Sequence, residues 1–403
     1  MENYAALIML VAVGCGLLDL LTDRWPAVQR QLFPVVTLVL YTLCVIAYYY
    51  GPDIWTYVPY YEEIESPVYI WTHASDKKLE LGYSLFCSVL NGLGLSYWWA
   101  TWVVKTLFFS AIYMLLRRLP RRQILAMAVV VMTDTNLIMH EMRQCLAVAF
   151  FIFMVLLMQN RRYILALLCA VLTVSMHKSG FLPVGLVWLG IFVYQTRQYA
   201  AVYTLLIIAL LVVMTLPVQH ISASALEVLP MPESYIKSLS HHLVLGLQFQ
   251  TIAVIYLALL LMLNLCLSYD RRARYSWIAF TVLSGMAVIV LLYPYYYLLA
   301  RMRSYFAPFI VYYIIAAWSG QERLSIPYEN LIKQTVIVLV LGYFTYTAVS
   351  LERSSRLLHT PAFRACTLFE LRHAGSRQVR DRQLKTAYSY WTQDYMKNEH
   401  NRL

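Results

Sequence analysis

Long apolar runs separated by short polar loops constrain this chain more than any other feature. A transmembrane α-helix needs about 17–25 predominantly apolar residues to cross the hydrocarbon core of a bilayer. We predict helices at 4–22, 32–50, 95–116, 123–138, 144–159, 163–176, 181–195, 199–217, 244–268, 276–293, 304–319 and 334–350. Some are short, which leaves room for one re-entrant segment. The pattern predicts an all-α polytopic membrane protein with about 12 transmembrane helices over residues 1–351, followed by a polar, basic C-terminal tail at 352–403.

The composition supports this class and excludes others. Hydrophobic residues make up 61% of the chain and charged residues 13%, against roughly 25% charged in an ordinary globular domain. Tyrosine and tryptophan, which favour membrane interfaces, are abundant, with 33 Tyr and 10 Trp. The net charge of +11 does not indicate nucleic acid as a partner, because most basic residues lie in short loops between apolar runs. The seven cysteines are scattered without metal-ligand or redox spacing.

The distribution of basic loops predicts the orientation. Lysine and arginine concentrate on the cytoplasmic side of membrane proteins. Fourteen basic residues lie on one predicted side: Arg24, Arg30, Arg117, Arg118, Arg121, Arg122, Arg161, Arg162, Arg197, Arg271, Arg272, Arg274, Arg323 and Lys333. Seven lie on the other side before the tail: Lys77, Lys78, Arg143, Lys178, Lys237, Arg301 and Arg303. The N-terminus and the loops 51–82 and 218–243 are therefore expected to be extracytoplasmic.

The first external loop, 51–82, is rich in carboxylates and aromatic rings, including Asp53, Tyr57 and Glu80. Carboxylate oxygens accept hydrogen bonds from sugar hydroxyls, and aromatic rings stack on the apolar face of a pyranose. A solvated loop beside an ordinary aromatic belt is an equally open reading.

A second polar cluster follows Asp134 and includes Glu141 and Arg143. An ionised side chain at bilayer depth costs roughly 2.5–3.5 kcal/mol, so it usually faces a cavity or a partner. Arg143 is suited to clamp a phosphate bidentately, or it pairs with Glu141 or Asp134 to hold the hairpin. Lys105, near the middle of the predicted helix 95–116, is also costly, and its sequence context suggests no role.

Two further clusters lie at the predicted outer ends of helices. His177 and Lys178 are followed by Ser179 and a helix break, and a neutral histidine is able to act as an acid, a base or a donor near pH 7. Arg301 and Arg303 lie in an apolar run, where two cations are expensive without an anionic partner. They suggest a diphosphate site, unless both side chains extend to the interface.

No P-loop, CxxC or HExxH motif occurs in the sequence, and no GxSxG motif occurs in a supporting context. The sequence therefore supports neither a nucleotide-driven reaction nor a zinc-dependent one. No clear DxD-like pair lies in an external loop, which weakens a metal-dependent sugar transfer.

The clusters together carry a family resemblance. In order they read Gly51-Pro52-Asp53 with Tyr57 and Tyr60, Glu80-Leu81-Gly82-Tyr83, Arg143-Gln144-x-x-Ala147, His177-Lys178-Ser179, and Arg301-x-Arg303-Ser304-Tyr305-Phe306. This order resembles the EpsG-like branch of the Wzy-type exopolysaccharide and O-antigen polymerases, over roughly residues 35–310. The inserted stretch 66–78 lengthens the spacing between the first two motifs, and the basic tail has no counterpart in the pattern.

The resemblance implies a membrane glycosyltransferase of GT-C-like architecture in the bacterial cytoplasmic membrane, with its active site facing the periplasm or exterior. Its substrates would be undecaprenyl-diphosphate-linked oligosaccharides, one as donor and one as acceptor, and a chain-length regulator is a possible partner. The resemblance implies no nucleotide sugar, no cofactor and no catalytic metal.

Residue roles follow from the same resemblance. Arg143, Lys178, Arg301 and Arg303 are candidates for binding the diphosphate. Asp53, Glu80 or Glu141 is the expected base that activates the acceptor hydroxyl, and His177 positions the acceptor or assists proton transfer. Tyr57, Tyr83 and Tyr305 are expected to shape the sugar groove.

Other classes remain open at this point. An O-antigen ligase or a membrane acyltransferase would show a similar composition. A flippase or other transporter also suits a dozen helices, but transporters place polar residues near the midplane and often carry inverted repeats. A structural scaffold would not need three arginines near bilayer depth.

Overall fold

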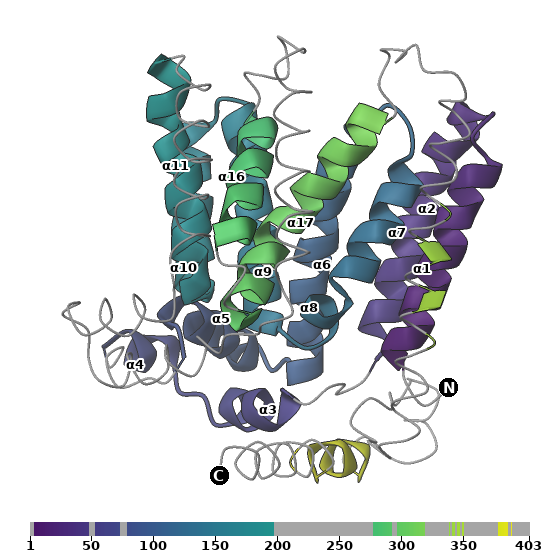
Figure 1. Ribbon diagram of the computed structural model, residues 1–403. Helices are drawn as coiled ribbons and strands as arrows, with labels where there is room; N and C mark the ends of the chain where they lie inside the picture. Colours follow the sequence, from purple (N-terminus) through teal and green to yellow (C-terminus); the bar gives the residue numbers. More distant parts are fainter. Residues whose placement is uncertain are drawn as a thin grey trace, which may run out of the picture. The chain divides into compact units, whose positions relative to one another are not determined.

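The computed structural model describes residues 4–47, 53–72, 79–196, 277–291, 296–318, isolated positions between 338 and 349, residues 378–385 and residue 388. All regular secondary structure in these ranges is helical (Figure 1). The chain divides into two compact units. The first contains 1–150, 175–178 and 314–403, and the second contains 151–174 and 179–313.

Four of the described helices are long and apolar enough to cross a membrane. They are α1 (Tyr4–Leu21), α2 (Pro26–Val45), α6 (Tyr97–Leu116) and α9 (Met142–Gln159). The other described helices are α3 (Ile54–Glu62), α4 (Pro67–Thr72), α5 (Leu81–Gly92), α7 (Gln123–Thr133), α8 (Thr135–Met139), α10 (Tyr163–Met176), α11 (Phe181–Thr196), α16 (Trp277–Leu291) and α17 (Tyr296–Trp318), with the short 3₁₀ helix η2 (Lys178–Gly180).

Most predicted helices within the described ranges are confirmed, with shifted ends. Helix α2 begins six residues early because Pro26, with its fixed φ, starts the helix at its first turn. The predicted helix 123–138 is broken at Asp134 into α7 and α8. The predicted helices 199–217 and 244–268 and the loop 218–243 lie outside the described residues, and 334–350 is described only at isolated positions.

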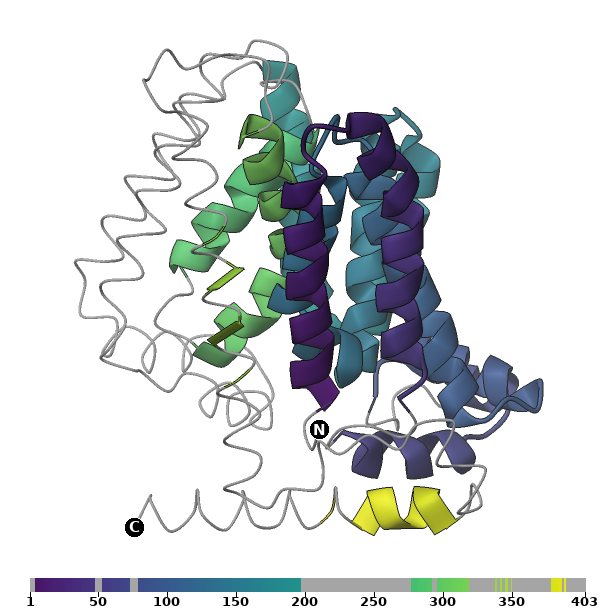
Figure 2. The same ribbon diagram turned by 90° about the vertical axis from the view of Figure 1, so that its right-hand side faces the viewer.

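The predicted loop 51–82 is partly helical, which the apolar-run pattern did not anticipate. Helices α3 and α4 lie within it, and α5 begins at its end. Each is too short to span a bilayer. Figures 1 and 2 show α3 lying beside one end of the long helices of the first unit.

In the first unit, α1, α2, α6 and α7 run alternately in opposite directions. Helix α1 packs on α7, and α2 packs on α6 and α7. Turns containing arginines connect these helices at one end of the bundle, where Arg122 forms ion pairs with the buried Asp19 at 3.2 Å and with Asp23 at 2.8 Å. Helices α3, α5 and α8 lie at the opposite end.

The outer face of α2 is apolar and exposed. Val35, Leu38 and Val39 keep 55%, 61% and 45% of their surface accessible. A continuous apolar face of this kind would be costly in water, whereas it suits the hydrocarbon core of a bilayer. The burial pattern therefore agrees with the hydropathy: polar side chains are few, and apolar surface faces outward.

The second unit is held by aromatic packing. Phe151 of α9 contacts Tyr305, Phe306 and Phe309 of α17 edge to face, with ring centroids 5.5–5.9 Å apart. Such pairs contribute about 0.5–1.5 kcal/mol each beyond the area they bury. At the other end of this part of α9, the side chain of Gln159 accepts a hydrogen bond of 2.9 Å from the backbone N–H of Trp277.

Residues 378–385 of the tail form a helical segment that contacts α3 within the first unit. Arg380 forms an ion pair with Glu62, and the ring of Tyr388 lies 4.4 Å from that of Trp55. Figure 2 shows this segment beside α3. The tail contact therefore places residues 378–385 and Tyr388 at the same end of the bundle as helix α3.

Candidate functional site

Helix α3 presents one face to the bundle because of its residue spacing. Ile54, Tyr57, Val58 and Tyr61 are buried and follow the i, i+3, i+4, i+7 pattern of an amphipathic helix. Trp55 lies on the exposed face. The pattern therefore directs the ring of Tyr57 inward.

Hydrogen bonds fasten α3 to α5 and to the start of α6. The hydroxyl of Tyr60 donates to Ser84 Oγ at 2.6 Å, and the side chain of Asn91 donates to the carbonyl of Tyr61 at 2.6 Å. Tyr61 donates its own hydroxyl to the carbonyl of Leu95 at 2.8 Å. The two short helices thus form one layer at this end of the bundle.

Glu80 immediately precedes α5, with an extended backbone at the N-cap position. Its carboxylate does not cap its own helix and instead points at two other elements. Arg143 Nη1 donates to one oxygen at 2.5 Å, and the backbone N–H of Lys178 donates to the other at 3.3 Å. Glu80 thus connects α5 to the start of α9 and to the turn after α10.

Arg143 lies in the first turn of α9 and is held on two sides. Besides the bond to Glu80, its Nε donates to the hydroxyl of Tyr57 at 2.9 Å, and its guanidinium carbon lies 5.2 Å from the centre of the Tyr57 ring. A guanidinium has five N–H donors, and two are used by partners within the described part of the chain. The side chain is 22% exposed, and its other three donors have no partner among the described residues.

Gly82 explains the close approach of α5 to the end of α10. A Cβ atom at this position would lie 2.4 Å from Ser175 Oγ and 2.8 Å from the backbone carbonyl carbon of Ser175. Only glycine permits this contact. The Glu80-Leu81-Gly82-Tyr83 motif therefore brings the Glu80 carboxylate to the backbone of Lys178.

The electrostatics fix the protonation of the central groups. Burial by itself raises the pKa of Glu80, but the charge of Arg143, backbone N–H donors and the nearby His177 outweigh it, and the pKa is lowered. Burial raises the pKa of Tyr57, and it raises that of Tyr83 well above the usual value. At neutral pH the cluster therefore contains an ionised carboxylate and neutral phenols.

The structure brings together five of the residues predicted from sequence: Tyr57, Glu80, Arg143, His177 and Lys178. Tyr83 lies beneath them, 2% exposed, with its ring 5.9 Å from that of Tyr57. Its position is that of a packing partner for Tyr57.

The remaining carboxylates lie at helix starts. Asp53 precedes α3 and Glu141 precedes α9, and both are half-buried. The hypothesis that Arg143 pairs with Glu141 or Asp134 is replaced, because the ion pair of Arg143 in the described residues is with Glu80.

Tyr305, Arg301 and Arg303 belong to the second unit. Tyr305 is fully buried, and its hydroxyl lies 3.1 Å from Ser179 Oγ. Arg301 and Arg303 are exposed on α17. No three His, Cys, Asp or Glu side chains in the described ranges lie close enough together to hold a metal ion.

Two features were missed by reasoning from sequence. The role of Gly82 required knowledge of its neighbour, although the glycine inside the motif was a visible signal. The surroundings of Lys105 also required the structure. Helix α6 begins at Tyr97, two residues later than predicted, and Lys105 is buried about two turns into it.

These observations define a class: a helical membrane protein with an arginine held by a carboxylate and a tyrosine at one end of its bundle. Residues 32–358 match the EpsG family, and the chain belongs to it. Neither curated proteins nor solved structures gave a match. Membership in this family indicates a glycosyltransferase-like membrane polymerase of the exopolysaccharide or Wzy type.

Proposed function

We propose that this protein transfers a growing oligosaccharide from its undecaprenyl-diphosphate carrier onto the next lipid-linked repeat unit, on the extracytoplasmic face of the bacterial cytoplasmic membrane. The observation that carries the proposal is the geometry of Arg143. Glu80 and Tyr57 fix its guanidinium, while its other three N–H donors have no partner among the described residues and would bind an anion. The product serves O-antigen, capsule or exopolysaccharide synthesis.

The main requirement of the reaction is stabilisation of the negative charge on the leaving diphosphate, rather than a cofactor. A hydroxyl oxygen of the acceptor attacks the anomeric carbon of the donor, and the bond from that carbon to the diphosphate oxygen breaks. The electron pair leaves with the diphosphate, and the acceptor proton passes to a base. Arg143 is suited to the leaving group because a guanidinium matches phosphate oxygens bidentately. Preorganised charge stabilisation of this kind is a large contribution to catalysis.

The site geometry suggests a division of roles among the carboxylates. Glu80 is ionised and forms an ion pair with Arg143. Because its pKa is lowered, it is a weak base. We assign it to positioning Arg143. Asp53 and Glu141 remain the candidate bases, with His177 assisting proton transfer or positioning the acceptor. Lys178, Arg301 and Arg303 remain candidate diphosphate ligands on the basis of the sequence.

The charge distribution supports the extracytoplasmic placement. In the first unit the site lies at the end of the bundle opposite to the turns that contain Arg24 and Arg117. Basic loops favour the cytoplasmic side. The rest of the proposal, about twelve transmembrane helices in a GT-C-like arrangement with a chain-length regulator as partner, extends from the family resemblance.

The test is the surface glycan of a deletion strain that carries wild type, Arg143→Ala or Arg117→Ala. Arg117 is an exposed arginine at the opposite end of the bundle and serves as the matched control. Wild type and the control are expected to restore a ladder of chain lengths, whereas Arg143→Ala leaves single repeat units. Immunoblots establish that the three proteins are equally abundant.

Other outcomes would point to the alternative functions. Repeat units trapped on the cytoplasmic face of the deletion strain would indicate a flippase. Long polymer left on its lipid carrier would indicate a ligase. A ladder unchanged by deletion would overturn the polymerase proposal.

A further inference from the structure

Lys105 places an ionisable amine inside the bundle of the first unit. It is the ninth residue of α6, about 12 Å along the helix axis from Tyr97 at 1.5 Å per residue. Only 3% of its surface is accessible. The mechanism proposed above does not use it.

Within the described residues, the side-chain nitrogen of Lys105 has one hydrogen-bond partner. Lys105 Nζ donates to the carbonyl oxygen of Cys44 at 2.6 Å. An ammonium carries three donors, and within the described residues Lys105 forms neither a second hydrogen bond nor an ion pair with a carboxylate. An ammonium group buried here without a counter-charge would be strongly destabilising, so a bound anion would stabilise the charged form of Lys105.

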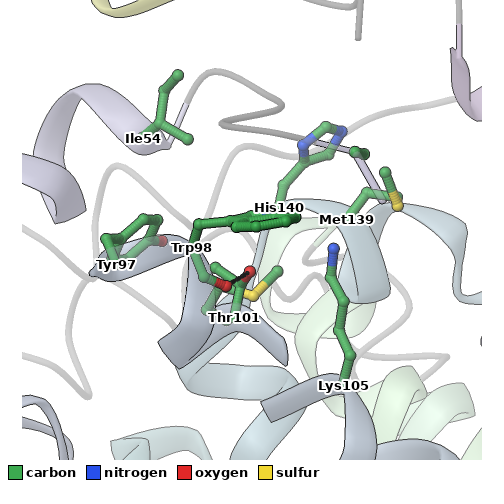
Figure 3. A pocket seen from close by; sticks show the side chains of 9 residues that line it. Ile54, Tyr97, Trp98, Thr101, Lys105, Met139 and His140 are labelled. Atoms are coloured by element: carbon green, nitrogen blue, oxygen red, sulfur yellow. Dashed lines mark hydrogen bonds between the residues drawn. The ribbon is translucent and has the colours of Figure 1, made fainter. Parts of the chain in front are cut away.

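A pocket adjoins the ammonium group. It is lined by residues of the first unit: Ala47, Ile54, Tyr97, Trp98, Thr101, Lys105, Met139, His140 and Met142. Figure 3 shows the Lys105 side chain directed toward the segment that contains Met139 and His140. The cavity volume of about 20 Å³ holds one water-sized group.

The pocket walls contribute little other charge. Burial, followed by the charge of Lys105, lowers the pKa of His140 to about 3, so the imidazole is neutral. The hydroxyl of Thr101 donates to the carbonyl of Trp98 at 2.6 Å. Lys105 is therefore the basic group of the pocket wall, surrounded mainly by apolar and aromatic groups.

We propose that this pocket binds a carboxylate group of an acidic sugar in the repeat unit, with Lys105 as its ion-pair partner. The sugar ring lies outside the pocket mouth, and one oxygen of its carboxylate enters. Lys105 is then a specificity-determining residue that favours acidic repeat units over neutral ones.

Size and charge favour a carboxylate over the diphosphate of the lipid carrier. The diphosphate carries more than one negative charge and would leave part of it unpaired beside a single ammonium group. A cavity with room for one water-sized group admits a single carboxylate oxygen but not two linked phosphates.

The pocket adjoins the candidate site through two elements. Helix α3 contributes Ile54 to the pocket and, one turn later, Tyr57 to Arg143. Met142 lines the pocket and directly precedes Arg143. The assignment of the carboxylate to a repeat-unit sugar rests on the proposed function, whereas anion binding by Lys105 does not.

The test is the thermal unfolding of the purified full-length protein in detergent with glucuronate, phosphate, chloride or glucose, at equal ionic strength for the three salts. We expect glucuronate to raise the unfolding temperature of the wild type by at least about 2 °C over chloride. Glucose is expected to have no effect. Lys105→Met removes the charge at similar length and should abolish the rise, whereas the exposed control Lys385→Met should retain it.

Several outcomes would overturn the inference. An equal rise with chloride would mean a site for small inorganic ions, and a rise with phosphate but not glucuronate would mean a phosphate site. A rise retained in Lys105→Met would remove Lys105 from the site. If Lys105→Met does not fold, Lys105→Gln replaces it. If neither variant folds, the preference of the wild type for glucuronate over chloride and phosphate decides. The experiment measures ligand binding and not polymerase activity. A negative result would therefore overturn the carboxylate site and leave the polymerase proposal intact.

Discussion

Gly82→Ala tests whether the contact between α5 and the end of α10 builds the site. The added Cβ would lie 2.4 Å from Ser175 Oγ, 2.6 Å from Ser175 Cβ and 2.8 Å from the backbone carbonyl carbon. A serine hydroxyl is able to rotate away, but the backbone carbon is not. The first turn of α5 must therefore move.

Two effects set the expected loss of stability. Overpacking of a close contact costs about 1–3 kcal/mol. Replacing glycine by alanine within a helix returns about 0.5–1 kcal/mol. The net destabilisation is therefore between about 0 and 2.5 kcal/mol.

The expected loss of activity is larger than the loss of stability implies. Glu80 lies two residues before Gly82, and its bond to the Lys178 N–H is already long at 3.3 Å. Moving α5 displaces the carboxylate that holds Arg143. A misplacement of about 1 Å in a catalytic group costs on the order of 10²-fold in rate, so the glycan ladder should collapse to short chains.

Gly92→Ala in the same helix is the matched control, because a Cβ there meets nothing within 4 Å. It should be neutral or slightly stabilising, with a normal ladder. Ser175→Gly in the Gly82→Ala background removes the two closest contacts and should restore part of the activity. Equal effects of Gly82→Ala and Gly92→Ala on unfolding temperature and ladder would refute the reasoning.

Three further predictions concern the same end of the protein. Arg143→Lys keeps the positive charge but removes the planar guanidinium that donates to both Glu80 and Tyr57. Polymerisation should therefore fall at least about 10²-fold at an unchanged protein level. Normal activity of Arg143→Lys would show that the charge alone suffices. The pKa of Glu80 lies below its ordinary value of 4.5. Its ion pair with Arg143 therefore stabilises the fold fully above pH 4.5, and this contribution is lost as the pH falls through the lowered pKa. Glu80→Gln should remove this loss of stability at acid pH, whereas the exposed control Glu63→Gln should retain it. The segment 378–385 contacts α3 through Arg380 and Glu62. Alkaline phosphatase should therefore be active, and hence extracytoplasmic, both when it is fused after Leu403 and when it is inserted into the loop 51–82. Activity of the loop insertion without activity of the C-terminal fusion would contradict this topology.

The membrane class and most helix positions were predictable from sequence because a bilayer imposes a length and an apolar composition on each span. Helix α3 was not predicted, because it is amphipathic and too short for an apolar-run criterion. The break at Asp134 was not predicted either. Apolar runs on both sides of a polar residue look continuous until the backbone shows where the helix ends.

The members of the candidate site were predictable, but their pairing was not. Tyr57, Glu80 and Arg143 were each conspicuous as polar or aromatic residues at predicted outer ends of helices. Their partners are 63 and 86 positions away along the chain, a separation on which local patterns contain no information. The neighbouring Glu141 was the closer choice in sequence, and tertiary packing favoured Glu80.

The central claim is that Arg143, held by Glu80 and Tyr57, acts on a lipid-linked donor. The most direct measurement is chain extension by the purified protein in liposomes that contain an undecaprenyl-diphosphate-linked repeat unit and no nucleotide sugar. The account predicts that wild type and Arg117→Ala lengthen the glycan with release of undecaprenyl diphosphate, and that Arg143→Ala does neither while remaining folded. Extension by Arg143→Ala at the wild-type rate would contradict it.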